Sequence, residues 1–367
     1  MADLSVTVNG MTFPNPFVLG SGPPGTNAKV INRSFSLGWG GIVAKTFSLE
    51  NDKVHNVVPR YARLKNRTDK TVIGFENIEL ISDRPFEAWL DDLADCKAKH
   101  PDKVLIASIM EEYNKDAWCE IVERTQEAGC DAFELNFSCP HGLPERRMGM
   151  AMGANPDIVE EVTGWVMSVA KIPVWAKMTP NVTDITEPAA SAIRGGAHGI
   201  SAINTILSVL GVNLKTLRPL PTVQGYTVPG GYSGQAVKPI ALRNVMNLAQ
   251  AFPDVPISGM GGVETANDAA EFILLGSSTV QVCTGAMLRG YELIEELCQG
   301  LSDFMDSHGF KSIEEFRGLT LPYFSTHADL VARQRAAKVA NAGRANRDDM
   351  WKGNIAKETE GLASEGG

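Results

Sequence analysis

Eight short apolar runs, most of them followed by a stretch with helical periodicity, constrain this chain of 367 residues more than any other feature. The runs lack an alternation of polar and apolar residues, which is typical of parallel strands covered on both faces. They occupy residues 17–20, 41–46, 104–108, 131–137, 172–178, 199–204, 255–260 and 278–283. Eight strand–helix units predict an α/β fold, a (β/α)8 TIM barrel. A doubly wound open sheet is the competing fold, because it repeats the same unit.

The segments between the strands carry helix signals. We expect helices over residues 83–99, 114–128, 156–170, 183–194, 238–251 and 264–275. Asn155 stands where a helix N-cap is expected, with Pro156 at the first helical position. Four glycines stand a few residues before the next strand and are expected to end helices in the left-handed conformation: Gly38, Gly129, Gly195 and Gly276.

Two long segments, residues 50–80 and 207–237, interrupt the alternation. Both follow the C-terminal end of a strand, the face on which barrels build their active sites. Long loops in a compact domain are usually functional, so we expect two loop insertions beside the site. Residues 1–335 are predicted to form the barrel domain, and residues 336–367 a charged helical tail that ends in disorder.

Charge and composition exclude several classes of protein. The chain has 34 basic and 43 acidic residues, a net charge of −9, which is unusual for a nucleic-acid-binding protein. It has no apolar run of about 18 residues that could span a membrane, and no signal-peptide pattern. Its six cysteines include no C-x-x-C pair, so their spacing provides no iron–sulfur cluster. We expect neither a nucleic-acid nor a membrane partner, and a cytoplasmic location, or the plastid stroma if a transit peptide has been removed.

The loop after the fourth predicted strand carries the most informative motif, Asn-Phe-Ser-Cys-Pro-His-Gly at residues 136–142. A cysteine just past a barrel strand can act as a proton donor or as a nucleophile. The alternative is a small buried side chain with a packing role. The position after the strand, between Asn136 and the Pro and Gly residues, favours a chemical role for Cys139.

Strand ends elsewhere in the sequence point to a phosphorylated cofactor. Glycine-bearing loops at residues 259–262 and 283–285 follow the last two strands, where barrels frequently hold a phosphate on backbone N–H groups. Lys45 and Lys177 end the second and fifth strands. A lysine buried there needs a charged partner or a ligand, whereas a lysine that reaches the surface needs neither. A cation beside an isoalloxazine ring would stabilise its anionic reduced form.

Polar side chains collect near the same expected face: Asn77, Glu79, Asn136, Asn204 and Thr205. Each of them alone is more often a turn or cap residue. An amide group both donates and accepts hydrogen bonds, so such a set suits a ring with alternating C=O and N–H groups. Together these residues favour recognition of a pyrimidine.

These motifs resemble the active-site segments of dihydropyrimidine dehydrogenases, within the dihydroorotate-dehydrogenase-like FMN barrels. The loop at residues 136–149 carries most of the resemblance, and five further segments agree with it: residues 45–47, 77–81, 176–181, 230–234 and 281–284. The resemblance covers roughly residues 4–335. It is greatest for the plant-type, NADP-linked enzymes, which share Pro-Glu-Arg-Arg at residues 144–147 and a C-terminal extension.

The resemblance implies roles for individual residues. Cys139 matches the catalytic acid of the family. The pyrimidine would contact Asn77, Glu79, Ile81, Asn136, Ser138, Asn204 and Thr205. FMN would contact Gly20, Ser21, Lys45, Thr46, Asn77, Lys177, Ser233, Gly234, Gly261, Gly262, Cys283 and Thr284. In the family reaction, reduced FMN passes a hydride to C6 of uracil or thymine and the cysteine gives a proton to C5, with NADPH as the electron donor.

The resemblance leaves the route of the electrons open. The animal enzyme adds FAD and iron–sulfur domains and the bacterial flavin subunit adds a ferredoxin-like tail, and this sequence carries neither pattern. NADPH therefore reduces FMN directly, or a separate electron-donor protein does so. The family tends to dimerise, so we expect a homodimer. The alternatives are a dihydroorotate dehydrogenase, a flavin-binding subunit without its own activity, and a tRNA-dihydrouridine synthase, which the net charge of −9 opposes.

Overall fold

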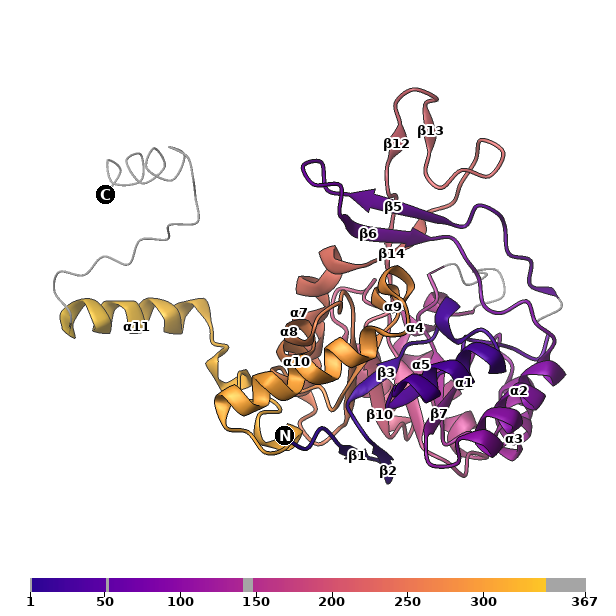
Figure 1. Cartoon of the computed structure of the whole chain (residues 1–367), viewed down its shortest axis with the longest axis horizontal. Helices are drawn as coiled ribbons and strands as arrows, with labels where there is room; N and C mark the ends of the chain where they lie inside the picture. Colours follow the sequence, from indigo (N-terminus) through magenta and orange to yellow (C-terminus); the bar gives the residue numbers. More distant parts are fainter. Residues whose placement is uncertain (1, 51–52, 141–147, 341–367) are drawn as a thin grey trace. The chain divides into compact units, whose positions relative to one another are not determined.

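Eight parallel strands close into a barrel in the computed structural model, which describes residues 2–50, 53–140 and 148–340 (Figure 1). In chain order they are β3 (Phe17–Leu19), β4 (Gly41–Val43), β7 (Val104–Ile109), β8 (Ala132–Asn136), β9 (Val174–Lys177), β10 (Gly199–Ala202), β15 (Ile257–Met260) and β16 (Thr279–Val282). β16 pairs with β3, which closes the sheet on itself. The predicted TIM barrel and all eight predicted strands are confirmed, and the open sheet is excluded.

Helices follow the strands and cover the outside of the barrel. They are α1 (Ala28–Leu37), α2 (Phe86–Lys99), α3 (Lys115–Glu127), α5 (Pro156–Met167), α6 (Thr186–Arg194), α7 (Lys238–Ala251), α8 (Ala266–Leu274) and α10 (Leu293–His308), with short helices α4 (Met150–Gly153) and α9 (Thr284–Arg289) at the loops. The six predicted helices are confirmed. The side chain of Asn155 accepts hydrogen bonds from two backbone N–H groups of α5, so it caps this helix as predicted.

Three of the four glycines that were predicted to end helices adopt a positive φ: Gly38, Gly129 and Gly276. The prediction for Gly195 is wrong, because its φ is −67°. Its neighbour Gly196 takes the left-handed position instead, with a φ of 103°. Gly195 serves close packing: a Cβ there would lie 2.7 Å from the carbonyl oxygen of Glu160 in α5.

The two insertions are not loops without regular structure. They contribute the strands of one antiparallel sheet in the order β11 (Ile206–Ser208), β14 (Gly230–Ser233), β6 (Val72–Asn77) and β5 (Tyr61–Lys65). We refer to these four strands as the cap sheet. The second insertion also forms the small hairpin of β12 (Val212–Asn213) and β13 (Arg218–Pro219). In Figure 1 these strands lie at the opposite end of the barrel from the first two strands of the chain.

Those first strands, β1 (Val6–Val8) and β2 (Met11–Phe13), form a hairpin that packs at the N-terminal ends of the barrel strands. Asn9 in its turn donates a hydrogen bond to the carbonyl of His198 (3.2 Å) and accepts one from the indole of Trp175 (2.7 Å). The side chain of Phe13 is fully buried. The open end of the barrel is therefore the C-terminal end, under the cap sheet.

The chain divides into two units, Met1–Leu321 and Pro322–Gly367. The second unit contains α11 (His327–Ala340). Residues 341–367, which make up most of the predicted tail, lie outside the described residues. Short 3-10 turns occur at Pro23–Gly25, Gln235–Val237, Ile313–Glu315 and Leu321–Tyr323. No helix in the described part of the chain has both the length and the apolar character needed to cross a membrane.

Candidate active site

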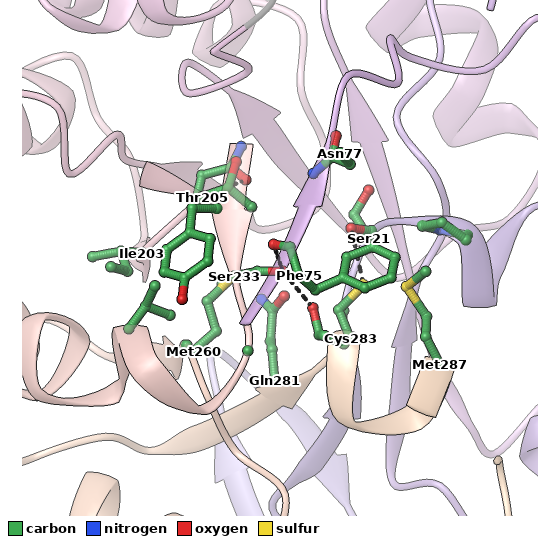
Figure 2. Close-up of a pocket in the computed structure, with 18 of the residues that line it drawn as sticks. Ser21, Phe75, Asn77, Ile203, Thr205, Ser233, Met260, Gln281, Cys283 and Met287 are labelled. Carbon is green, nitrogen blue, oxygen red and sulfur yellow. Dashed lines mark hydrogen bonds between the residues drawn. The ribbon is translucent and has the colours of Figure 1, made fainter. Parts of the chain in front are cut away.

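A cavity lies between the C-terminal ends of the barrel strands and the cap sheet. The space between the two layers, including its open mouth, amounts to about 1110 Å³. Figure 2 shows side chains entering it from both layers: Asn77 and Phe75 from β6, and Gln281 and Cys283 from the end of β16. Every predicted site residue except Ser138 lines this one cavity. The structure therefore brings together residues from all parts of the barrel sequence, while their binding roles stay predictions.

A chain of hydrogen bonds connects the polar residues of the cavity wall. The amide of Asn136 donates to the hydroxyl of Thr46 (2.9 Å), and the hydroxyl of Ser138 donates to the Oδ1 of Asn136 (2.9 Å). The amide of Asn204 in turn donates to the hydroxyl of Ser138 (2.8 Å). Ser138 is fully buried behind the wall, and it orients both amide groups. The Oδ1 of Asn204 also accepts a hydrogen bond from the backbone N–H of Thr205 (2.8 Å). Both amides are therefore held at the nitrogen and at the oxygen, which fixes the direction of the second N–H of each.

The cap sheet and the loop after β10 add two more polar side chains. Asn77 donates a hydrogen bond to the carbonyl of Gly231 (3.2 Å), across from β6 to β14. Thr205 packs against the same glycine so closely that a Cβ at Gly231 would lie 2.2 Å from its hydroxyl oxygen. A glycine is therefore required in β14 for the two insertions to meet at the cavity.

Lys45 is buried, so the surface-exposed alternative for it is wrong. Its ammonium lies 2.8 Å from one carboxylate oxygen of Glu79, and the guanidinium of Arg60 lies 3.0 Å from the other. Burial, together with the Glu79 carboxylate beside it, raises the pKa of the Tyr61 phenol well above its usual range. Tyr61 therefore stays a hydrogen-bond donor next to the carboxylate. Glu79 is held in the wall by cations from both the barrel and the cap.

Lys177 is also buried, and its partner is a residue that the sequence analysis did not identify. Its ammonium lies 3.1 Å from the carboxylate of Glu134 in β8, a side chain with no exposed surface. The amide nitrogen of Gln281 donates to the other carboxylate oxygen (2.8 Å). The Oε1 of Gln281 is buried and has no partner among the described residues, and Gln281 lines the cavity. The sequence did contain a signal for Glu134, because a glutamate inside an otherwise apolar predicted strand needs a charged partner.

Cys139 lies in an apolar corner of the cavity, packed with Ile81, Met110 and Met148. Its carbonyl accepts a hydrogen bond from the backbone of Met150 at the start of α4 (3.0 Å). A Cβ on Gly149 would lie 2.9 Å from the Cβ of Cys139, so only glycine fits beside the cysteine. Residues 141–147, and with them the Pro-Glu-Arg-Arg motif, lie outside the described residues.

The glycine loops form a cradle at the ends of β14, β15 and β16. Gly234, Gly261 and Gly262 all have positive φ, and a Cβ on Gly262 would lie 2.8 Å from the Cβ of Lys238. The hydroxyls of Ser233 and Thr284 meet 2.8 Å apart at its edge. This backbone suits a phosphate group. With the two buried lysines and the unpaired Gln281 oxygen, the cavity provides donors and acceptors that match a flavin with a phosphate tail.

Some lining residues were not predicted from the sequence, including Tyr61, Phe75, Tyr232, Met260, Gln281 and Met287. Met260 and Gln281 sit in predicted strands near their C-terminal ends, so their position was a usable signal. The sequence offered no such signal for Tyr61 and Phe75 of the cap sheet, because the pairing between the two insertions is not visible in the sequence. Burial raises the pKa of Cys283, in the same wall, to about 11. Within the described ranges, no group of three or more His, Cys, Asp or Glu side chains is arranged to hold a metal ion.

Comparison with known proteins places the chain among related sequences. The dihydroorotate dehydrogenase family model matches residues 3–305. The chain is 57% identical to the chloroplastic dihydropyrimidine dehydrogenase (NADP(+)) of Arabidopsis thaliana, over 99% of this chain and 88% of that protein. It is 45% identical to the NAD-dependent dihydropyrimidine dehydrogenase subunit PreA of Escherichia coli K12, over 86% and 76% of the two chains. It is 36% identical to the catalytic subunit of dihydroorotate dehydrogenase B (NAD(+)) of Pyrococcus abyssi, over 87% and 99%.

A solved structure shares the fold. The crystal structure of DHODH in complex with ferulenol from Eimeria tenella superposes with a TM-score of 0.72, covering 86% of this chain and 88% of that one. The sequence identity is 22%, so this similarity concerns the barrel architecture alone.

Proposed function

The chain belongs to the dihydroorotate dehydrogenase family, and we propose that it is a flavin-dependent dihydropyrimidine dehydrogenase that reduces uracil and thymine to 5,6-dihydropyrimidines with NADPH. The observation that carries the proposal is the shared cavity, where Cys139 and the amide groups of Asn136 and Asn204 face the same space as two buried lysines. The A. thaliana relative with 57% identity bears this enzyme name, which supports the same assignment.

FMN fits the cavity, and named residues would hold it. The glycine cradle with Ser233 and Thr284 would take the phosphate, and Lys45 and Lys177 would lie beside the ring system. When bound, FMN supplies hydride chemistry, taking electrons from NADPH and delivering them to C6 of the pyrimidine. Gln281 would offer its unpaired Oε1 to an N–H group of the cofactor, which accounts for an otherwise unsatisfied buried acceptor.

The protein residues orient the pyrimidine and move a proton. The second N–H groups of Asn136 and Asn204, whose amides are fixed through Ser138, would donate to the ring carbonyls, and the Oδ1 of Asn204 would accept from a ring N–H group. Such preorganised donors stabilise the negative charge that develops on the carbonyl oxygens during reduction. The Sγ of Cys139 would then give its proton to C5. The apolar side chains around Cys139 keep water away from this proton.

The charges in the wall oppose the dihydroorotate alternative. Orotate carries a carboxylate that needs additional cationic or amide contacts. In the described part of the wall, Lys45 is paired with Glu79 and Lys177 with Glu134. A neutral pyrimidine therefore suits the site better than an anionic one. The preference between uracil and thymine depends on a single methyl group, worth only about 1–3 kcal/mol in a pocket.

Oligomeric state and location complete the proposal. We propose a homodimer, following the tendency of the family, and direct reduction by NADPH rather than by a partner protein. The E. coli relative is a subunit by name, so a separate electron donor is the alternative. The A. thaliana relative is chloroplastic by name, which supports the plastid stroma for this chain over the cytoplasm.

Replacement of the proposed acid tests the function. Under anaerobic conditions, NADPH should bleach the flavin absorbance of the purified protein, and added uracil should restore it. Cys139→Ala should slow the uracil step by at least about 100-fold, the typical contribution of a general acid, while FMN stays bound. Cys119→Ala, which changes a thiol in α3 on the outside of the barrel, is the control. Wild-type reoxidation by uracil in the Cys139 variant would refute the assignment.

A further inference from the structure

Positive charge gathers on β5, the edge strand of the cap sheet, although the whole chain carries −9. Between residues 53 and 75, Asp69 is the one acidic residue. The basic residues of β5 and its turn are Arg60, Arg63, Lys65, Arg67 and Lys70. A local positive region on an acidic protein attracts anionic ligands and guides their approach.

Arg63 lies on the face of the cap sheet that covers the cavity. In the antiparallel pair of β5 and β6, Tyr61 stands opposite Asn77 and Arg63 stands opposite Phe75. Residues directly opposite each other share a face. Tyr61, Phe75 and Asn77 all line the cavity, and the rings of Tyr61 and Phe75 lie 5.4 Å apart. Arg63 therefore follows Tyr61 on the same face of the sheet.

Lys65 lies beyond Arg63 on the same strand, and we refer to these two residues as the row. It follows Arg63 by two residues on β5, beyond a shift in the pairing register between Leu64 and Lys65, and stands opposite Val72 of β6. Both side chains are exposed. Within the described residues, the side chains of Arg63 and Lys65 form no hydrogen bond and no ion pair, in contrast to Arg60, which is paired with Glu79. The row therefore presents two cations without an ion-pair partner among the described residues, and Arg63 shares a sheet face with the aromatic pair of the cavity wall.

We propose that Arg63 and Lys65 bind the phosphate groups of the nicotinamide dinucleotide that reduces this enzyme. The inference rests on the proposed function and adds a docking site for its electron donor. Arginine holds a phosphate through paired N–H donors, and lysine adds a compact charge. The rings of Tyr61 and Phe75, tilted by 36° to each other, provide an aromatic wall against which a base or nicotinamide ring can pack.

The position of the row favours a dinucleotide over an acidic protein. Arg63 shares a face of the cap sheet with Tyr61 and Phe75, which line the cavity, so a small molecule held at Arg63 can extend a ring towards that cavity. A folded redox protein is too large to enter it.

The row is also separate from the glycine cradle. β5 is two strands away from β14, or about 10 Å at the usual strand spacing. The cradle and Ser233 lie at β14 and the last two barrel strands. We therefore assign Arg63 to the electron donor and not to the phosphate of the resident flavin.

Charge reversal on the FMN-loaded enzyme tests the proposal. Calorimetric titration with NADP+ should show a dissociation constant at least 10-fold higher for Arg63→Glu than for the wild type. Lys65→Glu should weaken binding in the same direction. Arg218→Glu makes the same charge change on the exposed strand β13 and should change the constant by less than twofold. Added salt should weaken binding to the wild type and have less effect on the variants.

Two further measurements separate this proposal from the proposed function. The FMN content of Arg63→Glu, and its reoxidation by uracil after chemical reduction, should equal those of the wild type. Unchanged NADP+ affinity, or loss of FMN from the variant, would overturn the docking site. A wild type that binds no NADP+ and accepts electrons only from an acidic redox protein would also overturn it, yet leave the pyrimidine reaction intact. Failure of uracil to reoxidise the wild-type flavin would refute the proposed function itself.

Discussion

Glu134 and Lys177 form a buried ion pair whose removal should strongly destabilise the barrel. The carboxylate has no exposed surface and the lysine side chain is 5% exposed, so each charge is poorly hydrated if its partner is lost. Breaking one side of such a pair typically costs about 3–5 kcal/mol, because the remaining charge stays buried. At the observed separation of 3.1 Å, two unit charges attract by about 5 kcal/mol with an effective dielectric constant near 20. The expected loss of stability and the calculated attraction are therefore of the same size.

A double-mutant cycle measures this coupling. We expect Glu134→Gln and Lys177→Met each to lower the free energy of unfolding by about 3–5 kcal/mol. The double variant removes both charges, so its loss should be at least about 2 kcal/mol smaller than the sum of the single losses. Urea unfolding of the flavin-free protein is the assay, because a bound cofactor would add its own stabilisation.

An exposed pair provides the matched control. Glu160 and Arg194 lie 2.8 Å apart, but their side chains are 43% and 56% exposed. Glu160→Gln should therefore lower the free energy of unfolding by less than about 1 kcal/mol. Single losses at Glu134 and Lys177 that simply add, with coupling below about 0.5 kcal/mol, would refute the reasoning.

Two further predictions concern packing and pH. Gly153→Ala places a Cβ 1.7 Å from the carbonyl oxygen of Phe137, so it should lower the melting temperature and slow uracil reduction by displacing the Cys139 loop. The control is Gly164→Ala on α5, where a Cβ meets open space; this variant should stabilise the protein by about 0.5–1 kcal/mol. Equal effects of the two variants would contradict the packing argument. Burial raises the pKa of the Cys96 thiol to about 12 from 9.0, so the folded protein keeps a proton that the unfolded chain loses above pH 9. Unfolding free energy in urea should fall as pH rises from 9 towards 12, with a shallower fall in Cys96→Ala; an unchanged slope would show that this thiol does not contribute.

Local patterns along the chain were enough to predict the barrel and to place the chemical residues at the ends of its strands. Apolar runs, the Asn155 cap and the glycine punctuation depend on local backbone preferences, so they are readable in a single chain. Because parallel barrel strands all end on one face, placing Lys45, Lys177 and Cys139 at strand ends was enough to predict that they meet.

The partners of those residues, in contrast, depend on contacts that exist only in the folded barrel. Which insertion strands pair, and so which side of β5 faces the cavity, depends on contacts between segments more than 100 residues apart. The same holds for Glu134, whose charge is compensated by Lys177 from the next strand and Gln281 from across the barrel, and for Ser138, which lies behind the wall. Local preferences act over a few residues, whereas a buried charge or amide is satisfied only by whichever side chains the closed barrel brings within hydrogen-bond distance.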